Sequence, residues 1–494
     1  MTTTTSTAVE LQHFIAGTWH DGSGSAFSSV NPARPSETVA HGLQAGAADV
    51  DHAMRSAVAA KHGWAHTPPH ERGAVLLRTA AILEEHAPAW GRELAREEGK
   101  TLAEGQGEVL RAAQIFRYYG NDGDREAGGI YSSPRRGEKI LVTRKPLGVV
   151  GVVTPFNFPI AIPAWKLAPA LAYGNTVVWK PASTVPLLAV RLAQAMEQAG
   201  LPSGVLSLLI GPGPLGTALV EHAALDGLSF TGSTGVGRSL AAAAAGRGVP
   251  IQAEMGGKNA AIVLADADLE LAAEQVMLGA FRSSGQKCTA TSRLIVADGV
   301  ADEFLTMLRD RAEALVVGEP TDHATHMGPV INGGAQASIQ SGIHRALAQG
   351  ASLLTGGLPY TDTARSTGYF VAPTILELPA SGQADVWREE LFGPVLAVRR
   401  ASSAAAAFDL ANDSEFGLSA ALFTQDLTLA LEGMEELDVG ILHVNSESAG
   451  ADPHVPFGGV KKSGYGPKEQ GQSAKEFYSH TTTVYLRGGQ AHRG

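Results

Sequence analysis

The sequence predicts an α/β protein built from two open, parallel-sheet α/β lobes, together with a small additional β segment. Two observations carry this prediction. Short apolar runs typical of buried strands alternate with helical patterns in two separate regions, 147–231 and 260–444. The 494 residues are 44% apolar and 18% charged, a balance that can bury large cores and excludes a chain that is disordered as a whole.

Helical patterns dominate the N-terminal third of the chain. Mixed charges and regular apolar spacing predict helices over 54–60, 73–98 and 102–118. A break is expected in the second of these helices, at Pro88. The uncharged runs 146–165 and 198–220 are long enough to suggest membrane spans, but each contains at least three prolines. We therefore expect them to be core strands and loops.

The two alternating regions supply the parallel sheets. The first region has strands over 147–153, 176–179, 205–210 and 227–231, with helices over 189–199 and from 216. The second has strands over 260–264, 292–296, 395–398, 420–423 and 440–444, with a helix over 300–315. The alanine-rich stretches 241–245 and 404–407 are predicted to be helical. Isolated strands are predicted at 139–144 and 481–487, and late strands of this kind often complete a neighbour's sheet, which favours an oligomer.

Charge and cysteine content exclude several classes of function. The chain has 38 Lys+Arg and 49 Asp+Glu, a net charge of −11, which argues against a nucleic-acid partner. Cys288 is the only cysteine, so an intrachain disulfide and a thiolate-cluster metal site are excluded, and no metal is expected. The stretch 1–7 lacks the basic and apolar regions of a signal peptide. We expect a soluble, cytoplasmic protein without a membrane partner.

Small polar residues surround Cys288 in the stretch 283–290 (SSGQKCTA), and Lys287 precedes it. Such surroundings can support a thiolate, the form in which cysteine acts as a nucleophile. A lone cysteine can equally be an inert core residue. The choice depends on whether other chemistry-bearing residues accompany it.

Two further polar side chains follow or end predicted strands. Asn157 lies in a proline-constrained loop, 154–159 (TPFNFP), at the carboxyl end of a strand, where open α/β sheets bind ligands. Its amide can donate to a developing oxyanion, an interaction typically worth ~3 kcal/mol, or it can merely cap the turn. Glu254 precedes paired glycines in 252–259 (QAEMGGKN) and suits a general base in a cleft, the alternative being a solvated turn acid.

Glycine-rich turns follow two predicted strands and open helices, at 211–216 (GPGPLG) and 230–237 (FTGSTGVG). Glycine lets backbone amides approach a phosphate at a helix N-terminus. The first turn has G-x-G-x-x-G spacing, but its two prolines remove amides that a phosphate would use, and the second is a variant. Ordinary strand-to-helix turns are the alternative for both.

Taken together and in order, seven motifs resemble those of the aldehyde dehydrogenase superfamily over nearly the whole chain. They are 155–159 (PFNFP), 180–181 (KP), 230–234 (FTGST), 254–258 (EMGGK), 285–288 (GQKC), 390–394 (ELFGP) and 456–459 (PFGG). The resemblance implies an NAD(P)-binding domain over 1–125 and 146–256, and a catalytic domain over 257–461. It also implies oligomerisation strands over 126–145 and 478–490, and assembly as a homodimer or homotetramer.

The resemblance further implies NAD(P)-dependent oxidation of a small aldehyde to a carboxylic acid. Cys288 would attack the aldehyde as a thiolate, giving a thiohemiacetal and then, after hydride transfer to the nicotinamide, a thioester. Asn157 and the backbone N–H of Cys288 would hold the oxyanion, and Glu254 would activate the water that releases the acid. A non-catalytic binding member of the family is the alternative, and the joint presence of these three residues argues against it.

Cofactor residues are assigned by the same resemblance. Lys180 would contact the adenosine ribose, Gly232 and Ser233 the pyrophosphate, and Glu390 with Phe392 the nicotinamide side. The other residues of the predicted cofactor site are Thr154, Pro155, Phe156, Ser183, Gly213, Gly216, Phe230 and Gly256.

Ser183 departs from the pattern of NAD-preferring members, which usually carry Glu three residues after the lysine, where it accepts a hydrogen bond from the ribose 2′-hydroxyl. A carboxylate would repel a 2′-phosphate, whereas serine can donate to it while Lys180 supplies positive charge. We predict that NADP is accepted and that NAD is also usable. The alternative is that serine tolerates both cofactors without preference.

The stretches 165–175, 285–293, 454–459 and 464–471 most resemble the 2-oxoglutarate semialdehyde (2,5-dioxopentanoate) dehydrogenase subgroup, and the tail 475–478 fits it too. Because that substrate ends in a carboxylate, its pocket should contain a cation. Arg282 is the candidate, with His454 as helper, and the alternative for Arg282 is a solvated helix-face arginine.

An aromatic aldehyde enzyme of the benzaldehyde or vanillin type is the other interpretation of the pocket. Phe156, Trp165 and Phe457 would then form a slot for an aromatic ring. Such aromatic residues line aldehyde tunnels generally, so they are also consistent with the first interpretation.

Overall fold

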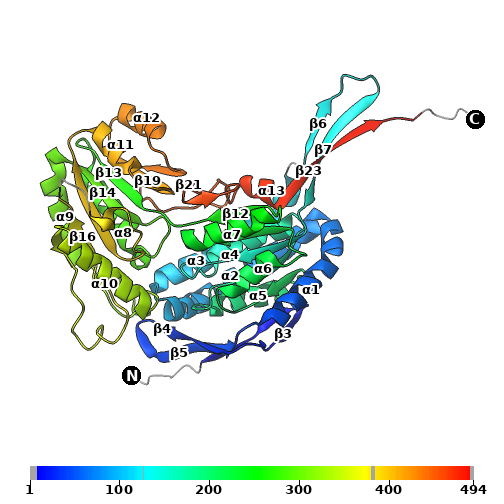
Figure 1. Cartoon of the computed structure of the whole chain (residues 1–494), viewed down its shortest axis with the longest axis horizontal. Helices are drawn as coiled ribbons and strands as arrows, with labels where there is room; N and C mark the ends of the chain where they lie inside the picture. The colour runs from blue at the N-terminus through cyan, green and yellow to red at the C-terminus, as the bar shows by residue number, and fades with distance from the viewer. Residues whose placement is uncertain (1–7, 126, 380–383, 490–494) are drawn as a thin grey trace, which may run out of the picture.

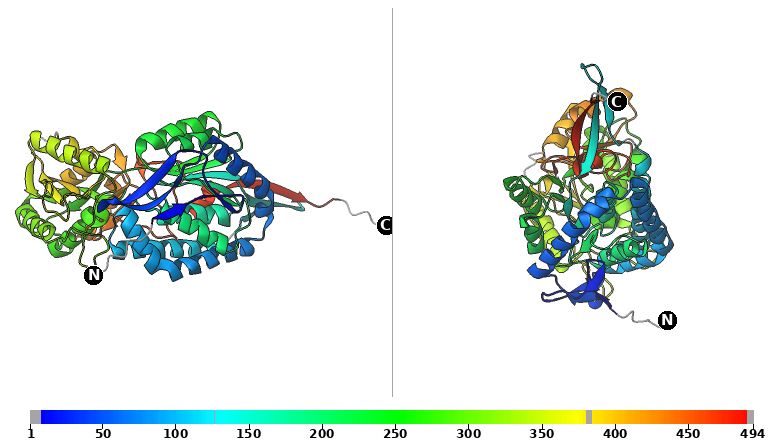
Figure 2. Two further views of the ribbon diagram at one scale, coloured as in Figure 1. Left: turned by 90° about the horizontal axis from the view of Figure 1, so that it is seen from below. Right: turned by 90° about the vertical axis from the view of Figure 1, so that its right-hand side faces the viewer.

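The computed structural model describes residues 8–125, 127–379 and 384–489, and it confirms the predicted α/β fold class. Two separate sheets with helices packed against them form two lobes that lie side by side (Figure 1). A narrow β extension projects from one lobe (Figure 2). The stretch 1–7, on which the signal-peptide prediction depends, lies outside the described residues, as do positions 126 and 490 of the predicted oligomerisation strands. Within the described part of the chain, no helix is long and apolar enough to cross a membrane.

The first lobe contains an eight-stranded sheet whose five central strands are parallel. In spatial order its strands are β22 (Gly464–Tyr465), β12 (Ile251–Glu254), β11 (Gly227–Thr231), β8 (Val149–Val153), β9 (Thr176–Lys180), β10 (Leu206–Leu208), β2 (His13–Ile15) and β3 (Thr18–His20). The chain runs outward from β8 to β10 and then returns to β11, on the other side of β8. The carboxyl ends of β8 and β11 therefore flank a topological switch point, where α/β sheets bind ligands.

Alternate side chains of β8 point to opposite faces of this sheet, as the pleat of a strand requires. Val150 and Val152 pack into the core on one face, under α2 (Pro69–Glu98), α3 (Leu102–Gly120), α4 (Ala161–Ala172) and α5 (Leu187–Gln198). Val149 and Val153 pack into the core on the other face, under α1 (Ala47–His66), α6 (Pro214–Glu221) and α7 (Thr234–Gly246).

Two of these helices differ from the sequence prediction because burial outweighs the effect of proline. The predicted break at Pro88 is wrong: α2 continues through it, since its apolar stripe packs along α3 and Gly91 lies against the backbone of Gln106. The run 146–165 is predicted to be strands and loops, yet α4 begins within it. Pro163 lies in the first turn of α4, where its missing N–H would have no partner within the helix.

The second lobe contains a seven-stranded sheet. In spatial order its strands are β15 (Ser352–Thr355), β16 (Thr374–Glu377), β17 (Val395–Ala401), β14 (Thr291–Ala297), β13 (Asn259–Val263), β19 (Ser419–Phe423) and β20 (Ile441–Val444). The helices packed against it are α8 (Leu269–Phe281) and α9 (Ala301–Glu313) on one face, and α10 (Gly333–Ala348) and α11 (Ala404–Asn412) on the other, with α12 (Leu427–Glu436) packed near α11. All strand pairs except β15–β16 are parallel, as the alternating sequence pattern predicts.

Both predicted isolated strands are present, as β7 (Glu138–Pro146) and β23 (Ser479–Arg487), and they pair with each other in an antiparallel ladder. With β6 (Gly129–Ser132) they form the projecting extension. The sequence does not predict a small N-terminal sheet, which consists of β1 (Val9–Leu11), β5 (Arg34–Leu43) and β4 (Ala26–Asn31). The other short elements are β18 (Phe416–Gly417), β21 (Val460–Lys461), α13 (Ser473–Tyr478), and the 3₁₀ turns η1 (Asp122–Asp124), η2 (Arg282–Gly285), η3 (Asp298–Val300) and η4 (Asp385–Trp387).

Candidate active site

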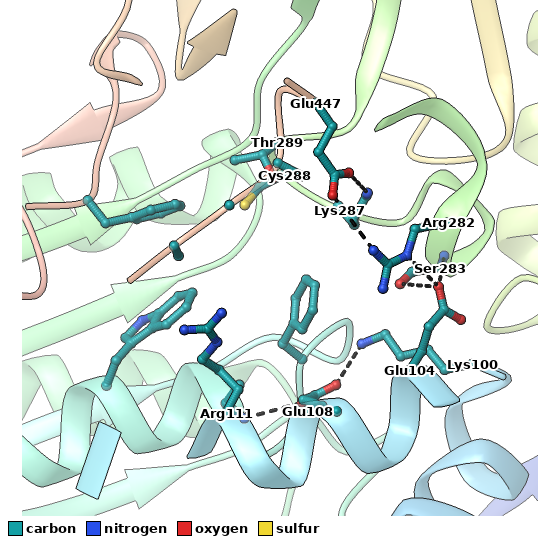
Figure 3. Close-up of a pocket in the computed structure, with 18 of the residues that line it drawn as sticks. Lys100, Glu104, Glu108, Arg111, Arg282, Ser283, Lys287, Cys288, Thr289 and Glu447 are labelled. Atoms are coloured by element: carbon teal, nitrogen blue, oxygen red, sulfur yellow. Dashed lines mark hydrogen bonds and ion pairs between the residues drawn. The ribbon is translucent and has the colours of Figure 1, made fainter. Parts of the chain in front are cut away.

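A cavity of about 310 Å³ is lined by α3 and α4 of the first lobe and by loop residues of the second (Figure 3). Cys288 and Thr289 lie on one wall. The aromatic rings of Phe158, Trp165 and Phe457 line it as well, and the rings of Trp165 and Phe457 are 5.4 Å apart, centre to centre. Charged side chains from α3 and from the second lobe complete the lining.

The loop that carries Cys288 is tied to α3. Glu104 Oε1 accepts a hydrogen bond from the backbone N–H of Ser283 at 2.8 Å, and the Ser284 hydroxyl donates to the carbonyl of Gly328 at 2.8 Å. Ser283 and Ser284 both have φ of +53°, a left-handed conformation that costs energy for residues other than glycine. The surrounding contacts therefore hold a strained turn four to five residues before the thiol.

Cys288 is half-buried, and its surroundings favour the protonated thiol. Burial raises the pKa of Cys288 to about 12, and the negative charges of Glu390 and Glu254 add to the increase. Lys287 does not support the thiolate in the way the sequence suggests. Its ammonium turns away, because it donates to the carbonyl of Leu278 at 3.2 Å and pairs with Glu447 at 3.5 Å.

Glu254 ends β12 and is 4% exposed, which excludes the alternative of a solvated turn acid. Its Oε2 accepts a hydrogen bond from the backbone N–H of Gly459 at 3.3 Å. Burial and the neighbouring Glu469 hold the pKa of Glu254 well above its ordinary value, while Lys166 and Lys468 act in the opposite direction. A carboxyl group in this state can gain and lose a proton closer to neutral pH.

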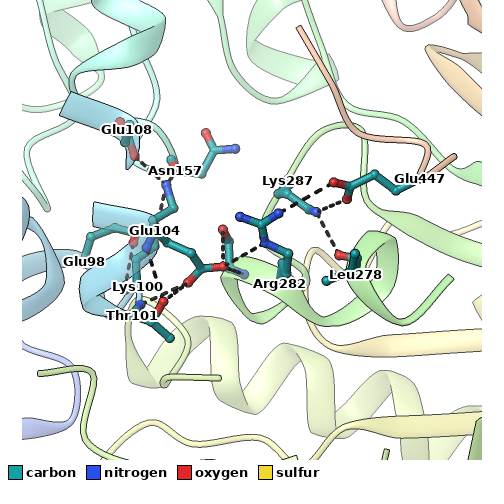
Figure 4. Close-up of polar contacts among 11 residues, drawn as sticks. Glu98, Lys100, Thr101, Glu104, Glu108, Asn157, Leu278, Arg282, Lys287 and Glu447 are labelled. Carbon is teal, nitrogen blue, oxygen red and sulfur yellow. Dashed lines mark hydrogen bonds and ion pairs between the residues drawn. The ribbon is translucent and has the colours of Figure 1, made fainter. Parts of the chain in front are cut away.

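Asn157 follows β8 and is 3% exposed, in a loop that buried charges hold in place (Figure 4). Its backbone carbonyl accepts a hydrogen bond from the Lys100 ammonium, which also pairs with Glu108 at 2.7 Å. Glu108 in turn accepts hydrogen bonds from the backbone N–H groups of Ile160, at 3.0 Å, and Ala161, at 3.2 Å. These contacts fix the loop between β8 and α4 from both ends.

The residues predicted to bind the cofactor gather around the carboxyl ends of four parallel strands. They are Thr154, Pro155 and Phe156 after β8, Lys180 and Ser183 at β9, Gly213 and Gly216 after β10, and Phe230, Gly232 and Ser233 at β11. Lys180 is 6% exposed; burial lowers its pKa to about 8, and its ammonium donates to the carbonyl of Pro181 at 3.1 Å.

Several polar groups at these strand ends fit an anionic, hydroxyl-rich dinucleotide. The buried hydroxyl oxygens of Thr231 and Thr234 have no hydrogen-bond partner among the described residues. Ser233, at the N-cap of α7, makes no side-chain capping bond, and a Cβ on Gly235 would meet no atom. The amides of this open helix N-terminus are suited to a pyrophosphate.

Gly256 and Glu390 meet beside the thiol. Glu390 Oε1 accepts a hydrogen bond from the backbone N–H of Gly257 at 2.9 Å, and a Cβ on Gly256 would collide with the Glu390 carboxylate. Burial raises the pKa of Glu390 to about 7. The rings of Phe156 and Phe392 stand edge to face with centres 5.8 Å apart, so the two segments that carry them are in contact.

Only some of the predicted substrate residues line the cavity. Trp165, Phe457 and Arg282 line the cavity, whereas His454 is exposed and is not among the described lining residues. Arg282 lies between two carboxylates, at 3.8 Å from Glu104 and 3.7 Å from Glu447 (Figure 4).

Sequence reasoning missed the charged face of α3, which lines the same cavity. Glu104, Glu108 and Arg111 lie one helical turn apart on that face. Their spacing of four and three residues, in a helix that otherwise buries its apolar stripe, is the signal that could have identified them.

The sequence profile of the aldehyde dehydrogenase family matches residues 19–484. The alpha-ketoglutaric semialdehyde dehydrogenase of Bacillus subtilis (strain 168) is 42% identical over 477 residues, covering 96% of this chain and 98% of that protein. The alpha-ketoglutarate semialdehyde dehydrogenase of Haloferax volcanii is 40% identical over 478 residues, with the same coverage of 96% and 98%.

Solved structures agree with these relatives. Betaine aldehyde dehydrogenase from Staphylococcus aureus, in complex with NAD+, matches with a TM-score of 0.94 and 30% identity over 98% of this chain and 97% of that one. The 3,6-anhydro-L-galactose dehydrogenase in complex with NADP matches with a TM-score of 0.93 and 34% identity over 97% and 100%. The profile match and the relatives each span nearly the whole chain, and the chain therefore belongs to the aldehyde dehydrogenase family.

Proposed function

We propose that this protein oxidises 2-oxoglutarate semialdehyde to 2-oxoglutarate with NADP or NAD. The observation that carries the proposal is the cavity in which the Cys288 thiol faces aromatic and cationic side chains. The buried carboxyl of Glu254 and the half-buried carboxyl of Glu390 act electrostatically on this thiol. The names of the Bacillus and Haloferax relatives support the substrate. The NAD+ and NADP complexes of the matching structures support the cofactor.

Cys288 begins the proposed reaction. Its sulfur forms a bond to the aldehyde carbon while the thiol proton passes to Glu254, whose raised pKa lets the carboxylate accept it. The aldehyde oxygen becomes an oxyanion, and the Asn157 amide and the backbone N–H of Cys288 donate hydrogen bonds to it. The product of this step is a thiohemiacetal.

Bound NAD(P) would supply the acceptor for the hydride, and the thiohemiacetal carbon, having lost it, is a thioester carbonyl. Glu390, Phe392 and Phe156 would hold the nicotinamide side. Lys180 and Ser183 would hold the adenosine ribose, and the amides around Gly232 and Ser233 the pyrophosphate.

Glu254 acts again when the thioester is hydrolysed, after it has released the thiol proton to solvent and is a carboxylate once more. It removes a proton from water as the oxygen attacks the thioester carbon, and the C–S bond breaks. The sulfur of Cys288 leaves as a thiolate and takes this proton, which restores the thiol. The ion pair between Lys166 and Glu469 lies behind Glu254, and the Lys166 ammonium also donates to Ser229 Oγ at 3.0 Å. The positive charge of Lys166 stabilises the carboxylate form of Glu254, and the negative charge of Glu469 destabilises it. Together they affect the pH at which Glu254 accepts a proton.

Lys180 and Ser183 lead us to propose that NADP is accepted alongside NAD. Among the described residues the Lys180 ammonium has no carboxylate partner, and burial makes a bound anion the favourable way to neutralise it. Ser183 is half-buried three residues further on and can donate to a 2′-phosphate.

An aromatic aldehyde is the second candidate substrate, and the wall formed by Trp165 and Phe457 favours it. Their ring centres are 5.4 Å apart, so a flat ring can pack against either. The charged side chains of the same cavity favour the carboxylated substrate instead.

The domain assignment and the assembly also belong to this proposal. The two sheets support a cofactor domain over 1–125 and 146–256 and a catalytic domain over 257–461. The extension carries exposed Ile130, Tyr131, Tyr485 and Leu486, which supports its use in a homodimer or homotetramer. A reactive thiol that has no disulfide partner suits a reducing, cytoplasmic compartment.

Formation of reduced cofactor by the purified protein tests the function. We would compare kcat/KM for 2-oxoglutarate semialdehyde, succinate semialdehyde, glutaraldehyde, benzaldehyde and vanillin with each cofactor. We expect kcat/KM to be ~100-fold or more higher for the carboxylated aldehydes. A Cys288→Ala variant should oxidise none of the aldehydes. Higher kcat/KM for benzaldehyde or vanillin would instead establish the aromatic substrate.

A further inference from the structure

Arg111 extends from α3 into the cavity, on the wall that faces Cys288 (Figure 3). It was not among the substrate residues predicted from the sequence. Its guanidinium pairs with Asp452 at 3.2 Å, and the two side chains are 40% and 60% exposed. An exposed ion pair of this kind contributes little and is easily exchanged for another partner.

The other cations of the cavity are held more firmly. Lys100 is buried and pairs with Glu108 at 2.7 Å, and Lys287 is held by Glu447 and by the carbonyl of Leu278. Neither ammonium can move to a ligand without leaving a buried carboxylate or carbonyl unpaired.

Arg282, the cation chosen from the sequence, lies 3.8 Å from Glu104 and 3.7 Å from Glu447. Both carboxylates are also fixed by other contacts, Glu104 by Ser283 and Glu447 by Lys287. A substrate carboxylate placed at Arg282 would therefore lie beside two negative charges that cannot move away, which disfavours binding there.

We propose that Arg111 binds the distal carboxylate of the substrate, and that Asp452 occupies this position until the substrate displaces it. The inference rests on the proposed oxidation of a carboxylated aldehyde, and it replaces Arg282 as the anchor. The nearest acid on α3, Glu108, does not compete, because Lys100 and the N–H groups of Ile160 and Ala161 already neutralise it. The guanidinium offers two parallel N–H donors to a carboxylate.

The position of Asp452 supports an exchange of partners. It belongs to the segment 447–457, which also supplies Ala449, Gly450, Ala451 and Phe457 to the cavity lining. The carboxylate of Asp452 therefore already lies against the Arg111 guanidinium, where we propose that the carboxylate of the substrate binds.

The test compares two aldehydes with the same five-carbon chain, glutarate semialdehyde and pentanal. Its readout is the ratio of their kcat/KM values in wild type, Arg111→Gln, Arg282→Gln and Arg117→Gln. Arg117 lies on the same helix but pairs with Glu84 outside the cavity, so it is the matched control. We expect Arg111→Gln to lower the ratio about 10- to 100-fold, while the other two variants change it less than about threefold.

Asp452→Asn adds an opposite expectation. Removing the competing charge should lower KM for glutarate semialdehyde about two- to fivefold and leave the KM for pentanal within error. A ratio that survives Arg111→Gln, or one that Arg282→Gln abolishes, would overturn the assignment of Arg111 while leaving the proposed substrate intact. A wild-type ratio near one would overturn the proposed substrate itself, and the inference with it.

Alkylation gives a second readout that needs neither turnover nor cofactor. Cys288 is the only cysteine, so iodoacetamide at alkaline pH, where more of the thiol is ionised, labels this one site. Glutarate should slow the labelling of wild type and of Arg117→Gln but not of Arg111→Gln, and circular dichroism of the three proteins would identify a folding defect. Equal protection in all three proteins would count against the anchor.

Discussion

Glu104 connects α3, which lines the cavity, to the loop that carries Cys288, because its Oε1 accepts a hydrogen bond from the backbone N–H of Ser283 at 2.8 Å. Its Oε2 accepts from the backbone N–H and the hydroxyl of Thr101, at 3.0 and 2.9 Å, and so caps the start of α3. One carboxylate therefore couples the beginning of a long helix to the position of Cys288.

Replacing Glu104 by Ala should release the strained turn at Ser283. We expect a loss of about 2 kcal/mol in the free energy of unfolding and a fall in kcat of about tenfold, measured by urea denaturation and by reduced-cofactor formation. Thr101→Ala removes only the capping partner, and it should lower stability without changing kcat. Equal loss of kcat in both variants would mean that the helix cap, and not the contact between Glu104 and Ser283, supports the loop.

The role of Glu254 predicts a defect in both halves of the reaction. Because its pKa is raised well above the ordinary value, the base form accumulates only as the pH rises, and kcat should increase with pH through that raised pKa. Because Glu254 accepts the thiol proton and later a proton from water, Glu254→Gln should slow the single-turnover formation of reduced cofactor and lower the steady-state rate by about 100-fold or more. A variant that turns over at the wild-type rate would exclude Glu254 as the base.

Glu390 should make stability depend on pH. Its pKa is about 7 in the folded protein and near 4.5 when unfolded, so folding is favoured by the protonated form. That contribution is complete below about pH 4.5 and is lost as the pH rises through 7. Between pH 5 and 8, Glu390→Gln should therefore gain about 2–3 kcal/mol of stability relative to wild type. Urea unfolding across this range provides the measurement, and the exposed neighbour variant Glu389→Gln should show no such trend.

Ser183→Glu should separate the two cofactors. A carboxylate at this position repels the 2′-phosphate of NADP but can accept from the 2′-hydroxyl of NAD. We expect Kd for NADP to rise by at least about tenfold, with Kd for NAD within threefold of wild type, as measured by fluorescence titration. Thr184→Glu adds the same charge at an exposed neighbour and should affect both cofactors alike. Unchanged NADP binding by Ser183→Glu would contradict our assignment of the ribose site.

Sequence patterns were sufficient where the determining interactions are local. The valine-rich run at Val149–Val153 can only be a strand buried on both faces, and its β–α–β context indicates a parallel sheet. The residues around Cys288, Glu254 and Asn157 carry their chemistry in short motifs. Glu254 acts electrostatically on Cys288, and Phe158, the neighbour of Asn157, lines the same cavity as Cys288.

Long-range contacts account for what the sequence did not reveal. Pro88 does not interrupt α2, because packing against α3 compensates for one lost hydrogen bond. Lys287 points away from its neighbour Cys288, because Glu447, 160 residues later, attracts it. Arg282 and Arg111 differ in how available each is to a substrate, because the fold places different carboxylates beside each guanidinium. The spacing of residues along the chain does not predict these contacts.

The protonated state of Cys288 has a consequence for oxidative damage. Peroxides attack thiolates and react slowly with thiols. With a pKa of about 12, the sulfur of the resting protein is almost entirely protonated at neutral pH. The nucleophile is therefore shielded from conversion to a sulfenic acid until the proton is withdrawn, so its vulnerability to peroxide is confined to the catalytic cycle.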